Sequence, residues 1–375
     1  MKYLYFLLAG VAFLYCSCEE EGSTPSLPSS SVASDLPLLR KGKHLGTIVG
    51  FNPSHPPATT DSIEARWQEA LQAGMSVGRL QIDWPELEPK AGVYDREALR
   101  KQLVDLENEG LQTFLLISVY DSDGPVVPEY LAGTPMNDAE LINSFVELMD
   151  WVIPMLVEHQ GWAIAISNEP DTFFKEKPQL VDELLPFVRE SRNHIHQLND
   201  KMAVTITMSA GSLAQNEEAM RRLGNELDII SFNTYGSGLF PMNRPYSEEE
   251  ILSNINAMLS FAGNKNMLFQ EVGMHTNQPI LNSSEEIQRT FFRTFFRAMQ
   301  NEPQMRVAYV FQLVDWSPET IEVFNTLYEP STPQSFIDEY SAVLASIGLI
   351  HYESGQRKAA WNEFVRWVET FKQTR

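Results

Sequence analysis

Short apolar runs alternate with longer amphipathic segments along most of the chain. The runs are rich in β-branched residues, which is typical of buried β-strands. Eight of them can be recognised, at residues 46–51, 76–82, 112–119, 162–167, 202–208, 227–233, 265–271 and 306–313. The segments between them, for example 61–74, 95–110 and 140–160, carry apolar residues three or four positions apart and predict helices.

Strands that alternate with helices favour a parallel sheet, and eight such units favour a closed (β/α)8 TIM barrel. An open doubly wound sheet is the alternative, but no glycine-rich phosphate loop follows the first run. A barrel uses about 250 residues or more as one domain. We therefore predict a single α/β domain over residues 41–375.

The residues before this domain have a different composition. Lys2 precedes an apolar run over residues 3–15, which has the length of a signal peptide and is too short to span a membrane comfortably. Both cysteines of the chain, Cys16 and Cys18, follow this run, so the predicted domain has no disulfide and no cysteine-ligated metal. Residues 19–40 are rich in Ser and Pro and predict a flexible tether.

Residues 1–18 resemble a bacterial lipoprotein signal, in which cleavage precedes a cysteine that is then lipidated. Cys18 is the better candidate because the small Ser17 precedes it, and Cys16 stays open as an alternative. The acidic residues 19–21 resemble the surface-export signal of some Gram-negative lipoproteins. The resemblance implies a lipid anchor in the outer membrane of a Gram-negative envelope, on its periplasmic or exposed face. An ordinary secretory signal is the alternative.

Charge and composition exclude some classes of partner. The formal net charge is -22, and such an acidic surface repels the phosphates of nucleic acid. The 43% of hydrophobic residues suffice for a large core. The seven histidines are scattered, and no His pair or carboxylate cluster has the spacing of metal ligands. We expect no metal and no other cofactor, and no pattern indicates the oligomeric state.

Polar residues follow several of the predicted strands, at the edge of the barrel where catalytic groups sit in this fold. They are Arg79 in the second run, Tyr120 and Asp121 after the third, Asn168 and Glu169 after the fourth, Asn233 and Tyr235 after the sixth, Glu271 at the end of the seventh, and Gln312, Asp315 and Trp316 after the eighth. Two glutamates thus end the fourth and seventh strands. Glycosidic cleavage needs one carboxylic acid to protonate the leaving oxygen and a second carboxylate as nucleophile or base.

Four motifs carry a resemblance to clan A of the glycoside hydrolases. They are SNEP at 167–170, FQEVG at 269–273, RLQIDWPELEPKAGVYD at 79–95 and IGLIHYESGQRKAAWNEF at 347–364. The resemblance covers residues 45 to 372. The motifs are similar to those of families 5, 39, 53 and 113 and do not single out one family. It implies a retaining glycosidase that acts by double displacement on a β-linked polysaccharide or oligosaccharide. We expect endo-acting hydrolysis, with exo-action open as the alternative, and the sugar and linkage stay open.

Position by position, the resemblance implies roles for several residues. Glu169 matches the acid/base, Glu271 the nucleophile, and Asn168 the residue that hydrogen-bonds the sugar 2-hydroxyl. Tyr235 and Arg79 match the groups that orient the nucleophile and keep it ionised.

Aromatic residues can form platforms for the C–H faces of a sugar. Trp316 resembles the floor of the clan's sugar site, and Trp84 is a candidate platform or a packing residue. His275 could line the cleft but matches no motif of the clan.

Two other classes of function stay open. A non-catalytic surface glycan-binding lipoprotein would keep the barrel without turnover, although both glutamates are present. A barrel enzyme of different chemistry would need a Schiff-base lysine or metal ligands at strand ends, and the sequence offers neither. The aromatic segment 291–299 has helical spacing and predicts a helix packed on the barrel rather than a cofactor site.

Overall fold

The computed structural model describes residues 35–49, 57–121, 124–238, 240–326, 328 and 331–373. The predicted signal segment, with Cys16 and Cys18, lies outside the described residues. Within the described part of the chain, no helix has both the length and the apolar character needed to cross a membrane.

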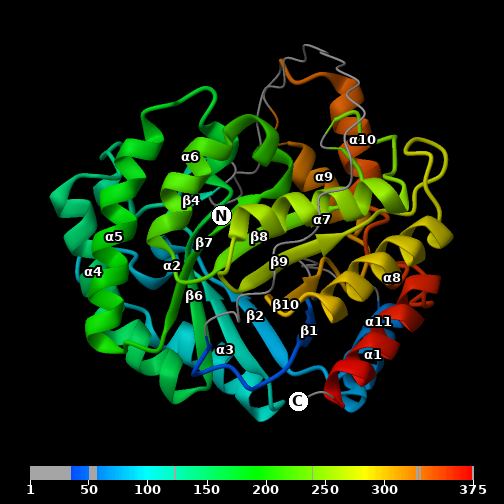
Figure 1. The fold of residues 1–375 in the computed structure, drawn as a ribbon, viewed down its shortest axis with the longest axis horizontal. Helices are drawn as coiled ribbons and strands as arrows, with labels where there is room; N and C mark the ends of the chain where they lie inside the picture. Colours follow the sequence, from blue (N-terminus) through cyan, green and yellow to red (C-terminus); the bar gives the residue numbers. More distant parts are fainter. Residues whose placement is uncertain are drawn as a thin grey trace.

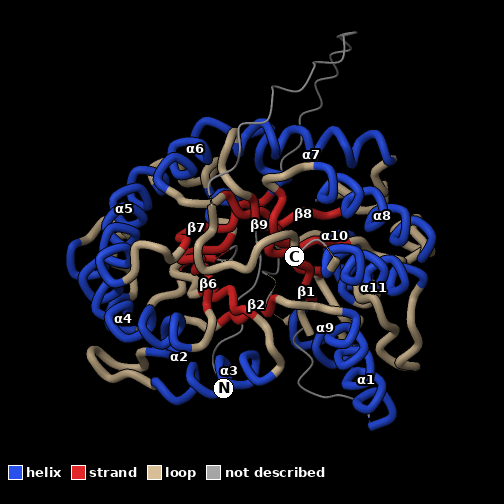
Figure 2. The backbone as a smooth tube through the Cα atoms, turned by 60° about the horizontal axis from the view of Figure 1, so that its bottom comes forward, coloured by secondary structure: helices blue, strands red, loops and turns tan. Residues whose placement is uncertain are grey.

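Eight parallel strands form the centre of the domain, and helices surround them (Figures 1 and 2). The strands are β1 (His44–Thr47), β2 (Val77–Gln81), β3 (Gln112–Leu116), β6 (Gly161–Asn168), β7 (Ala203–Ser209), β8 (Ile230–Tyr235), β9 (Met267–Gly273) and β10 (Met305–Val310). Their hydrogen-bonded order is β1-β10-β9-β8-β7-β6-β3-β2, and β1 also lies beside β2. The ring is therefore nearly closed, and the predicted (β/α)8 barrel is confirmed. A small antiparallel pair, β4 (Tyr120–Asp121) and β5 (Gly124–Pro125), follows β3.

A glycine permits the close approach of β1 and β2 at the seam of the ring. A Cβ atom at Gly46 would lie 2.5 Å from the carbonyl oxygen of Val77 and 2.7 Å from the ring of Tyr309. The Tyr309 hydroxyl donates to the carbonyl of Gly78 at 3.2 Å, so β10 also reaches β2 across the barrel interior. Any larger residue at position 46 would push the seam apart.

The outer helices are α1 (Pro57–Ala73), α3 (Arg96–Asn108), α4 (Ala139–Glu158), α5 (Leu180–Leu198), α6 (Leu213–Glu226), α7 (Glu248–Ala262), α8 (Glu285–Asn301) and α11 (Ala359–Lys372). Several begin at capping side chains: Asp95 accepts from the backbone N–H of Ala98, and Ser247 and Glu250 form a capping box. Shorter helical segments in the loops are α2 (Trp84–Leu87), η1 (Glu129–Leu131), η2 (Pro170–Phe173) and η3 (Ala210–Ser212).

The aromatic segment 291–299 lies in α8, as predicted. Phe291, Phe292, Phe295 and Phe296 are all buried, and Phe269 of β9 meets Phe295 edge-to-face with 4.9 Å between ring centroids. The aromatic residues therefore attach α8 to the strand that carries Glu271.

The end of the predicted tether already belongs to the folded domain. Leu36 and Leu39 are buried in an apolar cluster with Phe114 and Trp162, at the N-terminal ends of the strands. The backbone N–H of Arg40 donates to the side-chain oxygen of Gln112 at 2.8 Å. Residues 35–40 thus close the end of the barrel opposite the candidate site.

Two further helices, α9 (Pro318–Asn325) and α10 (Gln334–Leu344), lie between β10 and α11 and beside each other at one side of the barrel (Figure 1). We call this pair the roof. Its aromatic residues pack on one another: Tyr340 stacks on Phe336 with 5.8 Å between centroids, and Trp316 meets Phe324 edge-to-face at 5.4 Å. The roof therefore has its own apolar core above the ends of the strands.

Candidate active site

A cavity of about 170 Å³ opens at the C-terminal ends of the strands. Eight of the residues singled out in the sequence line it: Arg79, Asn168, Glu169, Asn233, Tyr235, Glu271, His275 and Trp316. The strands that carry these residues are far apart in the chain, and only the closed ring brings their ends together.

The strand that leads to Glu169 ends in an unusual turn. Glu169 has a left-handed backbone, with φ 49° and ψ 38°, which costs a non-glycine residue about 1–3 kcal/mol. Its N–H donates to the carbonyl of Thr207 at 2.7 Å, and its carbonyl accepts from the Thr172 hydroxyl at 2.7 Å. Pro170 then begins η2, where its fixed φ suits the first helical position. The turn directs the chain out of β6 and leaves the carboxyl at the cavity.

The surroundings of Glu169 disfavour its ionised form. Burial raises the pKa of Glu169 well above its usual value, and the charges of Asp171 and Glu271 add to the rise. Asp171 is itself fully buried, and burial raises its pKa to about 7, although the backbone N–H of Ser209 donates to both of its oxygens. The protonated form of Glu169 is therefore more favoured than that of an ordinary exposed glutamate.

Glu271, on β9, has partners that favour the opposite state. The Tyr235 hydroxyl donates to its Oε2, and a guanidinium nitrogen of Arg79 lies 3.4 Å from its Oε1. Burial raises the pKa of Glu271, whereas the Arg79 charge and the Tyr235 hydrogen bond oppose that rise. Of the two carboxyls, Glu271 thus ionises first, and the different environments separate their roles.

A buried amide network holds Asn168 at the cavity wall. Its side-chain NH₂ donates to Asp121 at 2.9 Å, and its side-chain oxygen accepts from Gln270 at 2.9 Å and Asn233 at 3.3 Å. Gln270 in turn accepts from the Thr207 hydroxyl at 2.8 Å. Because every bond of this network is buried, the orientation of Asn168 is strongly determined.

Trp84 does not line the cavity, and of its two alternatives from the sequence, sugar platform or packing residue, its burial fits the packing residue. Its indole is fully buried, donates to Glu88 at 2.8 Å and meets Phe145 of α4 edge-to-face at 5.2 Å. The short helix α2 turns this side chain into the packing between the barrel and its outer helices. The sequence around Trp84 could not decide between the two alternatives, because its packing partner Phe145 lies about sixty positions away.

The sequence pattern missed three aromatic residues of the cavity, Phe311, Phe324 and Tyr340. Phe311 lines it directly after β10 and meets Tyr235 edge-to-face at 6.3 Å. Tyr340 comes from α10 of the roof, and its pKa is raised well above the usual value by burial and, among other charges, those of Glu271 and Glu169. Trp316 lines the same cavity but is largely covered by Phe324. The aromatic surface of the site is therefore built from the end of β10 and the roof together.

No group of three or more His, Cys, Asp or Glu side chains with the arrangement of a metal site occurs among the residues that the structure describes.

Comparisons with known proteins show the fold and little more. No protein-family model matches the chain, and no curated protein matches it either. Among solved structures, an exo-β-1,4-mannosidase from Opitutaceae bacterium strain TAV5 is 17% identical with a TM-score of 0.64, and the match covers 93% of this chain but only 63% of that chain. A GH5_18 protein from Bifidobacterium longum subsp. longum, in complex with Manβ1-4GlcNAc, is 14% identical with a TM-score of 0.63, covering 88% of this chain and 78% of that one. The chain therefore shares its barrel fold with solved glycosidases.

The electrostatics of Glu169 predict that Glu169→Gln raises the free energy of unfolding, and that the gain grows with pH. The pKa of Glu169 is raised in the folded state, so both states bind the proton below the unfolded value near 4.5. Above that pH the unfolded state releases the proton while the folded state keeps it. Ionisation then stabilises the unfolded state, so the free energy of unfolding of the wild type falls as the pH rises. Urea denaturation at pH 4 and pH 7.5 measures the gain. The exposed Glu322→Gln on α9 is the control, and a gain for Glu169→Gln that is equal at both pH values would contradict the prediction.

Proposed function

We propose that the protein is a retaining glycoside hydrolase that cleaves β-glycosidic bonds by double displacement. The observation that carries this proposal is the pair of glutamates in one cavity with opposite surroundings. Glu169 lies near Asp171 and keeps its proton, whereas Glu271 is held by Arg79 and Tyr235 and loses its proton first. An acid and a nucleophile at neutral pH are what glycosidic cleavage requires.

In the first step the Glu271 carboxylate attacks the anomeric carbon while Glu169 donates its proton to the leaving oxygen. The aglycone leaves with that proton, and the sugar is bound to Glu271 as an ester. Arg79 and Tyr235 aim the attacking carboxylate, and Phe311 offers an aromatic surface to the sugar ring.

In the second step Glu169 takes a proton from water, and the resulting hydroxide displaces the sugar from Glu271. The change of role has a local cause. The charge of Glu271 is one of the contributions that raise the pKa of Glu169, and the ester removes this charge. The pKa of Glu169 then falls, so the residue that was an acid becomes a base. A purely glycan-binding barrel would not need this coupling of two carboxyls.

For this chemistry we expect Glu169→Gln to lower kcat roughly 10²–10⁴-fold on β-glycosides with poor leaving groups, because the leaving oxygen is no longer protonated. On aryl β-glycosides with an activated leaving group, the variant should keep much more of the wild-type rate of the first step. Steady-state and burst kinetics measure both, with Glu322→Gln as the control, and NMR of the first-formed product reports its anomeric configuration. Equal losses on both substrate types would remove Glu169 as the acid, and an inverted product would exclude double displacement.

We further propose that hydrolysis takes place at a chain end or on a short oligosaccharide, in contrast to the endo-acting hydrolysis expected from the sequence. The cavity of about 170 Å³ is smaller than the roughly 300–1,000 Å³ of pockets for larger ligands. Tyr340, Val343 and Leu344 of α10 form part of its wall. Support also comes from the similarity of the fold to an exo-β-1,4-mannosidase.

Product sizes test this mode of attack. Digestion of β-linked oligosaccharides of defined length should release single sugars and a product one unit shorter. Tyr340→Ala should enlarge the cavity and admit longer end groups, whereas Val323→Ala, at an exposed position of the roof, should leave the product pattern unchanged. Early accumulation of mid-length products by the wild type would instead indicate attack within the chain.

We also propose that Cys18 carries a lipid anchor in the outer membrane of a Gram-negative bacterium, as the sequence of residues 1–18 implies. Cys18→Ala should abolish lipid labelling and release the protein from the membrane fraction, because the acceptor thiol is lost. Cys16→Ala is the matched control and should stay anchored. Unchanged labelling of the Cys18 variant, together with loss in the Cys16 variant, would move the anchor to Cys16.

A further inference from the structure

His275 is a buried polar side chain of the cavity with no role in the mechanism above. It follows β9, four residues after Glu271, lines the same cavity and is only 2% exposed. Neither ring nitrogen has a hydrogen-bond partner within the described part of the chain. The backbone of Met242 influences the ring and partly opposes the fall of its pKa.

An unsatisfied buried polar group destabilises the folded state, so its presence in the cavity points to a partner that binds there. The protonation state of the ring defines that partner. Burial, together with the charge of Lys358, lowers the pKa of His275 to about 4, so the imidazole is neutral near neutral pH. A neutral imidazole offers one N–H donor and one nitrogen acceptor. A hydroxyl group also has one donor and acceptor lone pairs, and it is therefore the natural complement.

The backbone on both sides of His275 is held firmly. The Gln288 side chain donates to the carbonyl of Met274 at 2.8 Å, and the Ser283 hydroxyl donates to the carbonyl of His275 itself at 2.7 Å. The N–H of Thr276 donates to the carbonyl of Ser346 at 3.1 Å. The ring thus lacks a partner although its own segment is fully anchored.

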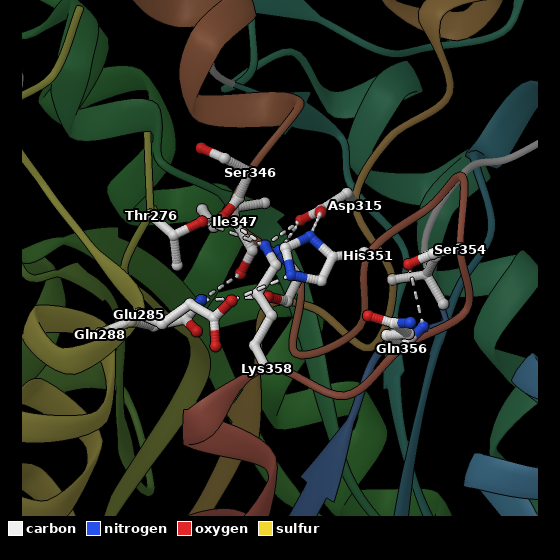
Figure 3. Close-up of polar contacts among 12 residues, drawn as sticks. Thr276, Glu285, Gln288, Asp315, Ser346, Ile347, His351, Ser354, Gln356 and Lys358 are labelled. Carbon is white, nitrogen blue, oxygen red and sulfur yellow. Dashed lines mark hydrogen bonds and ion pairs between the residues drawn. The ribbon is translucent and has the colours of Figure 1, made fainter. Parts of the chain in front are cut away.

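A buried ion pair between Lys358 and Asp315 lies next to this segment, as Figure 3 shows. Lys358, whose side chain is fully buried, donates to Asp315 at 2.6 Å and to the carbonyl of Ser346 at 2.9 Å. Asp315 also accepts from the N–H of Gly348 at 2.7 Å. The network joins the segment after β9, the end of the roof and the start of α11, and it anchors the backbone next to His275.

We propose that His275 is a substrate-binding residue that selects a hydroxyl group of the neutral sugar ring bound between Glu169 and Glu271. This inference rests on the proposed glycosidase function and names a determinant of its specificity. The His275 ring would form its hydrogen bond with one hydroxyl of the sugar. A sugar that lacks this hydroxyl leaves the ring unpaired and therefore binds more weakly.

The test uses aryl β-glycosides of several sugars and their monodeoxy analogues. His275→Phe keeps the ring volume and removes both hydrogen-bonding nitrogens, while His275→Gln keeps a donor and an acceptor. We expect His275→Phe to lower kcat/KM about tenfold or more on the preferred glycoside, a loss of the size of one hydrogen bond. On the analogue that lacks the selected hydroxyl, wild type and variant should have equal kcat/KM. His275→Gln should recover part of the loss.

The control is His159→Phe. This histidine is also buried, but it is hydrogen-bonded to Glu107 at 2.6 Å and lies outside the cavity, so the variant should keep the wild-type kcat/KM on every substrate. A merely structural role of His275 would lower activity equally on the parent glycoside and all its deoxy analogues, and that result would overturn the inference while the wild-type activity still supports the proposed function. Hydrolysis of no β-glycoside by the wild type would overturn both.

Discussion

The closure of the strand ring between β1 and β2 is the constraint on which the site depends. Arg79 lies on β2, at one end of the hydrogen-bonded order, and Glu271 lies on β9, next to β10 near the other end. Their ion pair exists only because β1 meets β2, and that contact needs the missing side chain of Gly46. An opened ring would keep most of its hydrogen bonds but would separate Glu271 from Arg79.

Within the closed ring, the chemistry follows from two neighbouring environments. Both carboxyls, of Glu169 and Glu271, are taken from water, which favours the protonated form of each. Arg79 and Tyr235 oppose that tendency for Glu271, whereas Asp171 strengthens it for Glu169. The left-handed turn at Glu169 is the cost of this arrangement, because a regular continuation of β6 would not end at the cavity in the same way.

The roof contributes side chains and contacts to the cavity that the strands and outer helices of the barrel do not provide. It places Tyr340 near both carboxyls, and through Ser346 it joins the buried Lys358–Asp315 pair that also anchors the segment of His275. Loops at the C-terminal ends of barrel strands are where such folds vary. The size of the cavity thus depends on the roof, while the pair of carboxyls in it depends on the strands.

The sequence by itself determined the alternation of strands and helices, because periodicity is a local property of the chain. It also identified Glu169 and Glu271, because a barrel brings the end of every strand to one face whatever the packing. Tertiary structure alone decided that Trp84 is a packing residue, that Phe311 faces the cavity and that the ring of His275 has no partner. Those properties depend on which distant side chains meet, and a linear pattern of polar and apolar residues does not contain that information.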